Sequence, residues 1–211
     1  MSRAVPWIIG LVVVLILLVA IPSCSYNRLV SLSQGVDKQW AQVQNVYQRR
    51  ADLIPSLVST VAGSANFEKS TLVEVTQARA SVGKVSLDPN TAPADAQKLA
   101  EFEKAQGQLT AALSRLLVVS ERYPELRSSS NFRDLQAQLE GTENRIAVER
   151  MRFNEAVQAY DTAIKSFPAV LYAGSMGFIT KPYFTASAGA EKAPTVQFDF
   201  SGKAPATQGR P

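Results

Sequence analysis

Two long stretches of this sequence repeat apolar residues every three or four positions, and this spacing constrains the fold more than any other feature. Such spacing places the apolar side chains on one face of an α-helix, so each stretch predicts one amphipathic helix. One charged residue, Arg50, falls on the apolar face of the first helix. We therefore expect two long helices that pack around a shared polar layer. The first stretch contains Val36, Trp40, Val43, Tyr47, Ile54, Leu57 and Val61, and the second contains Phe132, Leu135, Leu139, Ile146, Phe153, Val157, Tyr160, Ile164 and Phe167.

Two further stretches with helical spacing lie between them, at residues 67–82 and 95–116, and segments rich in Gly, Pro, Asp and Asn separate the four. The predicted fold class is all-α: an N-terminal membrane helix followed by an antiparallel up-and-down four-helix bundle of long helices. The alternative is a parallel coiled-coil oligomer, but the loop-like breaks favour chain reversal within one subunit. Pro55 lies inside the first long stretch and predicts a kink or a local break there.

An uncharged apolar run from Ala4 to Ile21 is close to the ~20 residues that span a bilayer. It predicts a single membrane anchor, because the run is longer than the core of a usual cleaved signal peptide. Cleavage and secretion is a second outcome, although no Ala-x-Ala site comes after the run. A lipoprotein is the third: Ile21-Pro22-Ser23-Cys24 resembles a lipobox, with Pro22 fitting it poorly, and Cys24 would then carry the lipid.

The expected organisation is an anchor over residues 1–25, a helical bundle over 26–184 and a flexible tail over 185–211. In the tail, residues 196–200 alternate like a short strand. Arg3 precedes the apolar run, whereas Arg28 and Lys38 come after it, so the positive-inside rule is nearly tied. A short positive segment before an apolar run favours export of the chain beyond that run. We expect a single-pass protein of the cytoplasmic membrane with its bundle on the extracytoplasmic side.

The composition excludes several kinds of catalytic and metal-binding site. The chain has no histidine and one cysteine, which removes the usual general base, the commonest zinc ligand and any internal disulfide. Its net charge of +4 is spread without the basic, aromatic-interleaved cluster of a nucleic-acid surface, so no nucleic-acid partner is expected. No motif of nucleophilic catalysis is present. We expect a protein that is not an enzyme, with no catalytic, metal-binding or cofactor-binding residues and no cofactor.

The polar layer is the one candidate site. Its predicted members are Arg50, Asp52, Glu140, Glu143 and Glu149, with Arg50 reaching Glu143 or Glu149 across the helix pair. The simplest interpretation is an ion pair that fixes the register of the two helices. A binding site for the carboxylate of a ligand or partner is the second interpretation, and acid–base chemistry is the third.

Several motifs follow one another in an order that resembles the LemA family, over residues 26 to about 200. They are Tyr26-Asn27, Tyr47-Gln48-Arg49-Arg50-x-Asp52-Leu53-Ile54-Pro55, Ala78-Arg79, Glu121-x-Tyr123-Pro124, Leu139-Glu140-x-Thr142-Glu143-Asn144-Arg145-Ile146, Phe153-Asn154, Phe167-Pro168, Gly177-Phe178 and Tyr183-Phe184. The resemblance implies a bacterial protein with an N-terminal membrane helix and an antiparallel helical bundle. Magnetosome-associated members imply a role in membrane organisation for one branch. The resemblance supplies no catalytic residues.

These observations favour a membrane-anchored bundle that acts as an interaction or scaffolding module for envelope proteins, with self-association into a homo-oligomer as one form of it. A membrane-surface organiser that binds anionic lipid is the first alternative. A carboxylate–metal hydrolase that uses Asp52, Glu140 and Glu143 is the second, and it requires those carboxylates to meet in a water-accessible pocket.

Overall fold

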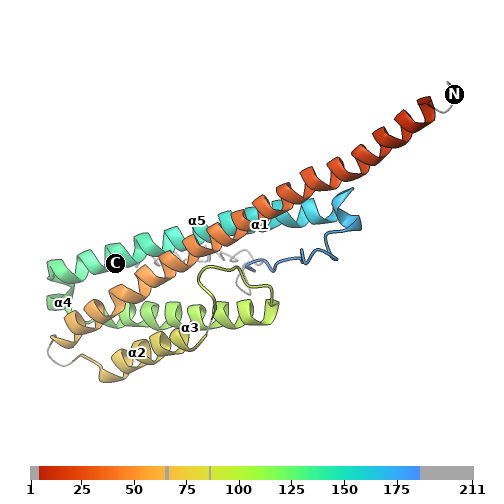
Figure 1. Ribbon diagram of the computed structural model, residues 1–211. Helices are drawn as coiled ribbons and strands as arrows, with labels where there is room; N and C mark the ends of the chain where they lie inside the picture. The colour runs from red at the N-terminus through yellow and green to blue at the C-terminus, as the bar shows by residue number, and fades with distance from the viewer. Residues whose placement is uncertain (1–4, 65–66, 86, 186–211) are drawn as a thin grey trace, which may run out of the picture.

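The computed structural model describes residues 5–64, 67–85 and 87–185, and within these ranges the protein contains helices but no β-strand. The side chains of residues 5, 6, 8, 9 and 12–24 lie outside the description. The helices are α1 (Val5–Ala62), α2 (Lys69–Lys84), α3 (Ala96–Ser120), the short α4 (Pro124–Ser128) and α5 (Ser130–Lys165), followed by the 3₁₀ turn η1 (Ala169–Leu171) (Figure 1).

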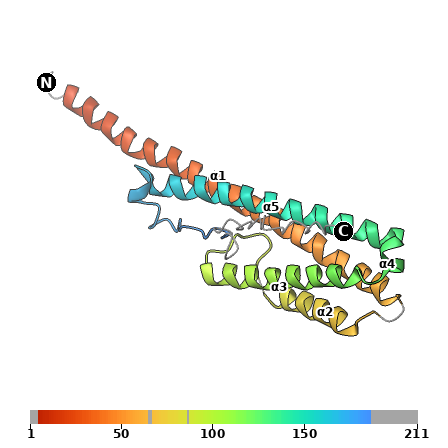
Figure 2. The ribbon, with the colours of Figure 1, turned by 180° about the vertical axis from the view of Figure 1, so that it is seen from behind.

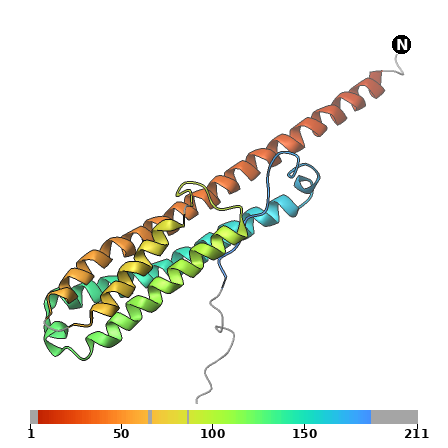
Figure 3. The same ribbon diagram turned by 90° about the horizontal axis from the view of Figure 1, so that it is seen from below.

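The four longer helices follow one another in alternating directions, so that α1 and α3 run one way and α2 and α5 run the other (Figure 1). α1 lies alongside α5, and α2 lies alongside α3, as the view from behind also shows (Figure 2). This arrangement is a helical bundle. The amino-terminal part of α1 projects beyond the other helices (Figure 3).

The apolar core consists of two clusters, and Arg50 lies between them. The cluster nearer the amino-terminal end of α1 is centred on Trp40, whose ring lies 5.9 Å from that of Phe102 and 5.6 Å from that of Phe153. Fully burying a large apolar side chain contributes about 1.5–3 kcal/mol, so these rings are a main source of stability. The other cluster is mainly aliphatic and includes Ile54, Leu57, Val61, Leu109, Leu116, Phe132 and Leu139.

α1 continues without interruption through Pro55, so of the predicted kink or local break, the break is wrong. The residues on both sides of the proline, Ile54 and Leu57, are buried in the aliphatic cluster. Burial of this helix face holds the segment helical although the proline lacks one backbone donor, because packing contributes more to helix stability than local propensity does.

The predicted anchor and the predicted bundle share one helix, because α1 extends from Val5 across residue 25 into the bundle. Within the part of the chain that the structure describes, no helix has the length and apolar character needed to cross a bilayer. Most side chains of the apolar run, including that of Cys24, lie outside the described residues. The strand-like segment at residues 196–200 also lies outside them.

After α5 the chain forms a connector, residues 166–177, and then an extended strap, residues 178–185. The connector ends at Gly177, whose φ of +83° is a conformation that side-chain-bearing residues rarely adopt. The strap runs back along the bundle, where Lys181 pairs with Asp37 of α1 at 2.8 Å. At its end the ring of Phe184 is buried against Trp40 and Phe153.

Candidate binding groove

Arg50 of α1 is the centre of the polar layer and is 2% exposed. Its Nη1 donates to Oε2 of Glu143 at 2.8 Å and to Oγ1 of Thr110 at 3.0 Å. Its Nη2 donates to Oε1 of Gln106, while its Nε has no hydrogen-bond partner. The guanidinium therefore connects α1 to α3, which carries Gln106 and Thr110, and to α5, which carries Glu143.

The contacts of the guanidinium explain why Arg50 is tolerated at this depth. A buried charge is costly unless it is paired and hydrogen-bonded, and the guanidinium of arginine has five donors in a rigid plane. The central carbon of the guanidinium, Cζ of Arg50, also lies 5.3 Å from the centre of the ring of Tyr47, which precedes Arg50 by about one helical turn. Burial raises the pKa of Tyr47 above its ordinary value of 10.0, although the cations of Arg150 and Arg50 oppose the shift.

Asp52 and Glu140 are not brought into contact with Arg50 among the described interactions. Both are exposed: Asp52 accepts a hydrogen bond from Gln48 at 2.8 Å, and Glu140 accepts one from Gln136 at 3.0 Å. Asp52 follows Arg50 by two residues, which is a rotation of about 200° around the helix axis and places it on the opposite face.

Glu149 also contacts residues other than Arg50. It accepts a hydrogen bond from Nε2 of Gln39 at 2.5 Å and pairs with Arg152 at 2.8 Å. Of the two carboxylates proposed for Arg50, the structure brings Glu143 to it and leaves Glu149 bonded elsewhere. Glu143 is 48% exposed, so the pair has one buried and one solvent-accessible member.

A groove lies over this pair, between α3 and α5, and we call it the α3–α5 groove. Arg50 and Glu143 line both of its parts. The larger part has a volume of about 570 Å³, and its lining includes the charged side chains of Glu103, Lys104 and Arg150. The smaller part has a volume of about 190 Å³, and its lining includes Leu113, Leu117 and Leu139. An aliphatic pocket thus adjoins a charged one.

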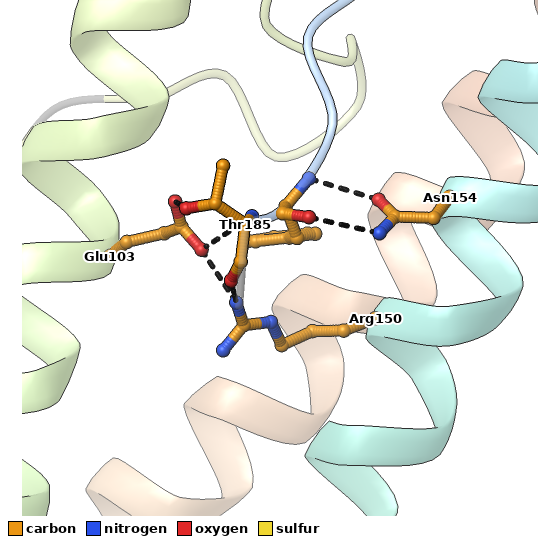
Figure 4. Close-up of polar contacts among 5 residues, drawn as sticks. Glu103, Arg150, Asn154 and Thr185 are labelled. Atoms are coloured by element: carbon orange, nitrogen blue, oxygen red, sulfur yellow. Dashed lines mark hydrogen bonds and ion pairs between the residues drawn. The ribbon is translucent and has the colours of Figure 1, made fainter. Parts of the chain in front are cut away.

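Thr185, at the end of the strap, is one of the residues that line the larger part, and Figure 4 shows its polar contacts. The backbone N–H and hydroxyl of Thr185 donate to Glu103 at 3.2 and 3.1 Å, and its carbonyl accepts from Arg150 at 2.9 Å. Arg150 also pairs with Glu103 at 2.5 Å, and its guanidinium lies 4.6 Å from the centre of the Phe184 ring. These side chains hold the strap at the mouth of the groove.

Asn154 fixes the residue before Thr185 in a second way (Figure 4). Its side-chain oxygen accepts from the backbone N–H of Phe184 at 2.9 Å, and its side-chain nitrogen donates to the carbonyl of Phe184 at 3.0 Å. The amide thereby takes the place of a neighbouring β-strand and satisfies both backbone groups of an extended residue.

The sequence pattern did not identify the partners of Arg50 on α3. Gln106 is buried and follows the buried Phe102 by four residues. A polar residue at that spacing lies on the apolar face of the helix, and this could have identified Gln106 as a member of the polar layer. Thr110 follows Gln106 by the same spacing, and its hydroxyl also donates to the backbone carbonyl of Gln106 at 3.1 Å. Glu103 carried no such signal, because its role depends on the strap.

The described residues contain no group of three or more Asp, Glu, Cys or His side chains with the placement to hold a metal ion. The groove offers instead a fixed cation, carboxylates and hydrogen-bonding side chains next to an aliphatic pocket. Such a surface is suited to recognition of a chain that presents both an apolar and a charged group.

The fold and this site define a helical-bundle protein with a charged layer beneath an open groove. A sequence model of the LemA family matches residues 39–198, and the chain belongs to that family.

Named relatives agree with this assignment. The chain is similar to magnetosome protein MamQ of Magnetospirillum gryphiswaldense, with 24% identity over 75% of this chain and 64% of that protein. It is 25% identical to magnetosome protein MamQ 2 of Paramagnetospirillum magneticum with the same coverage. It is 21% identical to protein LemA of Metamycoplasma hominis over 67% of this chain and 60% of that one. The chain thus spans less than two thirds of the length of these relatives.

Proposed function

We propose that this chain is a membrane-anchored bundle that binds another envelope protein through the α3–α5 groove. The observation that carries the proposal is the buried, partly satisfied guanidinium of Arg50 at the boundary of a polar and an aliphatic pocket. Arg50 is itself buried and bonded, so its role is to hold Glu143 in place at the groove, and the exposed Lys104 of the same lining is the cation that an incoming carboxylate can reach.

The two pockets specify the chemistry of the partner. The aliphatic part accommodates one apolar side chain, because a cavity of about 150 Å³ is known to hold a benzene ring. The polar part supplies Lys104 and Arg150 as accessible cations beside the carboxylates of Glu103 and Glu143, while the buried Arg50 holds Glu143. We expect the partner to be a protein segment that presents an aromatic or aliphatic residue beside an Asp or Glu side chain.

The membrane half of the proposal is supported by the apolar run from Ala4 to Ile21 and by the continuity of α1. A helix that continues from an anchor into a bundle holds the groove at a fixed height above the bilayer. We place the bundle on the extracytoplasmic side, by the positive segment that precedes the run. The names of two relatives connect them with the magnetosome, and that assignment remains theirs.

The hydrolase alternative gains no support from the described geometry. It requires Asp52, Glu140 and Glu143 to share a pocket, but only Glu140 and Glu143 line the smaller part of the groove. Asp52 is not in that lining, and both Asp52 and Glu140 are exposed and bond to glutamines on their own helices. Glu143 is engaged by Arg50 at 2.8 Å. The arrangement favours recognition over carboxylate chemistry.

Photo-cross-linking in native membranes tests the proposal. The full-length chain would carry p-benzoylphenylalanine in place of Ala111, which is exposed on α3 and lines the groove. The matched control carries it in place of Gln108, which is exposed on the same helix and is absent from the lining of the described groove. Mass spectrometry then identifies the adducts.

The proposal predicts one dominant protein adduct at position 111 and at least tenfold less of it at position 108. Equal adducts at both positions would show that the contact is not made by the groove. Absence of any protein adduct at position 111, with the chain present in the membrane fraction, would contradict the interaction function.

A further inference from the structure

The connector exposes several large apolar side chains at one end of the bundle. Phe167 is 81% exposed and Leu171 is 75% exposed. Val170 and Met176 of the connector, and Ile179 at the start of the strap, are also exposed. Single exposed apolar residues are ordinary, but contiguous patches mark surfaces that contact a partner or a membrane.

The position of this patch along α1 is fixed by packing. The ring of Phe178 lies 5.6 Å from that of Tyr26 in an edge contact, and Leu29 shares a core cluster with Ala169 and Ala173. A pocket of about 410 Å³ at this end is lined by both α1 and the connector, including Arg28 and Phe167. Figure 3 shows the connector curled against α1 at the end of the bundle nearer the amino terminus.

This position is close to the apolar run. Tyr26 follows Ile21 by five residues and Leu29 follows it by eight, and at about 1.5 Å per residue these are distances of about 7.5 and 12 Å along the helix. The polar headgroup layer beyond the hydrocarbon core is about 5–7 Å deep on each side of a bilayer. Amphipathic elements at membrane surfaces bury their apolar side by about 5–10 Å.

We propose that the connector inserts into the bilayer surface, with Phe167 and Leu171 at the boundary of headgroups and acyl chains. The inference rests on the proposed anchoring of residues 4–21 and adds a second, peripheral contact that the anchor does not require. Arg28 and Lys165 are exposed nearby and supply cations for lipid phosphates, as lysine and arginine do at membrane interfaces. The paired contact fixes the tilt of the bundle relative to the membrane.

The occupant of the patch is a bilayer and not another protein because the patch lies just beyond the end of the apolar run. A protein partner bound here would have to fit within about 12 Å of the hydrocarbon, and headgroups occupy about 5–7 Å of that distance. The mixture of bulky apolar residues with cations at the rim is typical of interfacial segments.

Cross-linking to lipid tests this inference in the full-length chain. The protein would be reconstituted in vesicles of phosphatidylethanolamine and phosphatidylglycerol with p-benzoylphenylalanine in place of Phe167 or Leu171. The control position is Val118, an equally apolar residue that is 66% exposed. It lies near the Ser120 end of α3, at the opposite end of the bundle from the connector (Figure 1).

The inference predicts phospholipid adducts at positions 167 and 171 at least tenfold above those at position 118. Adducts at 167 and 171 no more abundant than at 118 would overturn it, and so would adducts formed mainly with a second copy of the chain. Retention of the chain during alkaline carbonate extraction monitors the anchor separately. Retention without lipid adducts contradicts this inference alone, whereas release contradicts the anchoring and the inference together.

Discussion

Nε of Arg79 in α2 donates a hydrogen bond to the backbone carbonyl of Ala51 in α1 at 3.2 Å. In a regular helix that carbonyl accepts from the N–H four residues later, but residue 55 is proline and has no N–H. Arg79 therefore supplies the donor that Pro55 removes. This contact explains how α1 continues through the proline, and it links α1 to α2 at that level.

A double-mutant cycle measures this relationship. We expect Arg79→Met to lower the free energy of unfolding by about 1 kcal/mol, since one hydrogen bond is lost. In a Pro55→Ala background the N–H of residue 55 can bond Ala51, so the same change should cost close to nothing. Urea denaturation of the four proteins gives the coupling. An equal cost in both backgrounds would show that Arg79 does not compensate for the proline.

Arg50→Met should destabilise the bundle by about 2–3 kcal/mol, which is less than the ~3–5 kcal/mol of a fully buried pair because Glu143 can be rehydrated. Part of the cost arises because the buried side chain of Gln106 loses its partner. Adding Gln106→Leu should therefore recover about 1 kcal/mol. Thermal unfolding measures both. If Arg50→Met and Glu143→Leu each melt like the wild type, the polar layer is not a structural element.

Asn154→Ala should release the end of the strap without unfolding the helices. It removes two hydrogen bonds to Phe184, which contribute about 2 kcal/mol together. Hydrogen exchange at the N–H of Phe184 should accelerate by about tenfold or more, since local opening governs exchange. The control is Asn144→Ala, an exposed position on the same helix. Unchanged exchange at Phe184 would mean that the ring alone holds the strap.

The stability of the bundle should fall at alkaline pH. Burial raises the pKa of Tyr47 above 10.0, and burial also raises the pKa of Tyr160 and of Tyr183. A raised pKa in the folded state gives stability that is complete below the unfolded pKa and is lost as pH rises through the folded pKa. Tyr47→Phe keeps the ring and should reduce the loss above about pH 10. An identical pH profile for both proteins would contradict this.

The helices could be predicted from the sequence because their apolar faces are continuous. The predicted stripe from Phe132 to Phe167 became α5 as far as Ile164, whereas Phe167 lies beyond the end of the helix and is 81% exposed, so its place on the apolar face was wrong. Asp95, expected to open a helix, caps α3 by accepting from the N–H of Gln97 at 2.8 Å. The short α4 was missed, because five residues cannot display a helical period. The continuity of α1 through Pro55 depends on packing and on Arg79, neither of which a local pattern contains.

The candidate site also has one part that the sequence pattern predicts and one part that it does not. Arg50 was detectable because a charge interrupts an otherwise apolar face. The strap was not detectable, because the contact of Asn154 with Phe184 joins residues 30 positions apart and depends on the turn at Gly177. Sequence spacing describes one helix at a time, whereas the groove arises from the placement of α3 relative to α5.

Quantitative co-isolation from gently solubilised native membranes tests most directly whether the α3–α5 groove binds a partner. Three full-length proteins would be compared: the wild type, Ala111→Trp, which fills the α3–α5 groove from an exposed wall position, and Gln108→Trp, which places the same ring outside it. Binding in the α3–α5 groove predicts the same partner with the wild type and Gln108→Trp, and at least tenfold less with Ala111→Trp. Equal recovery of that partner with all three proteins would contradict it.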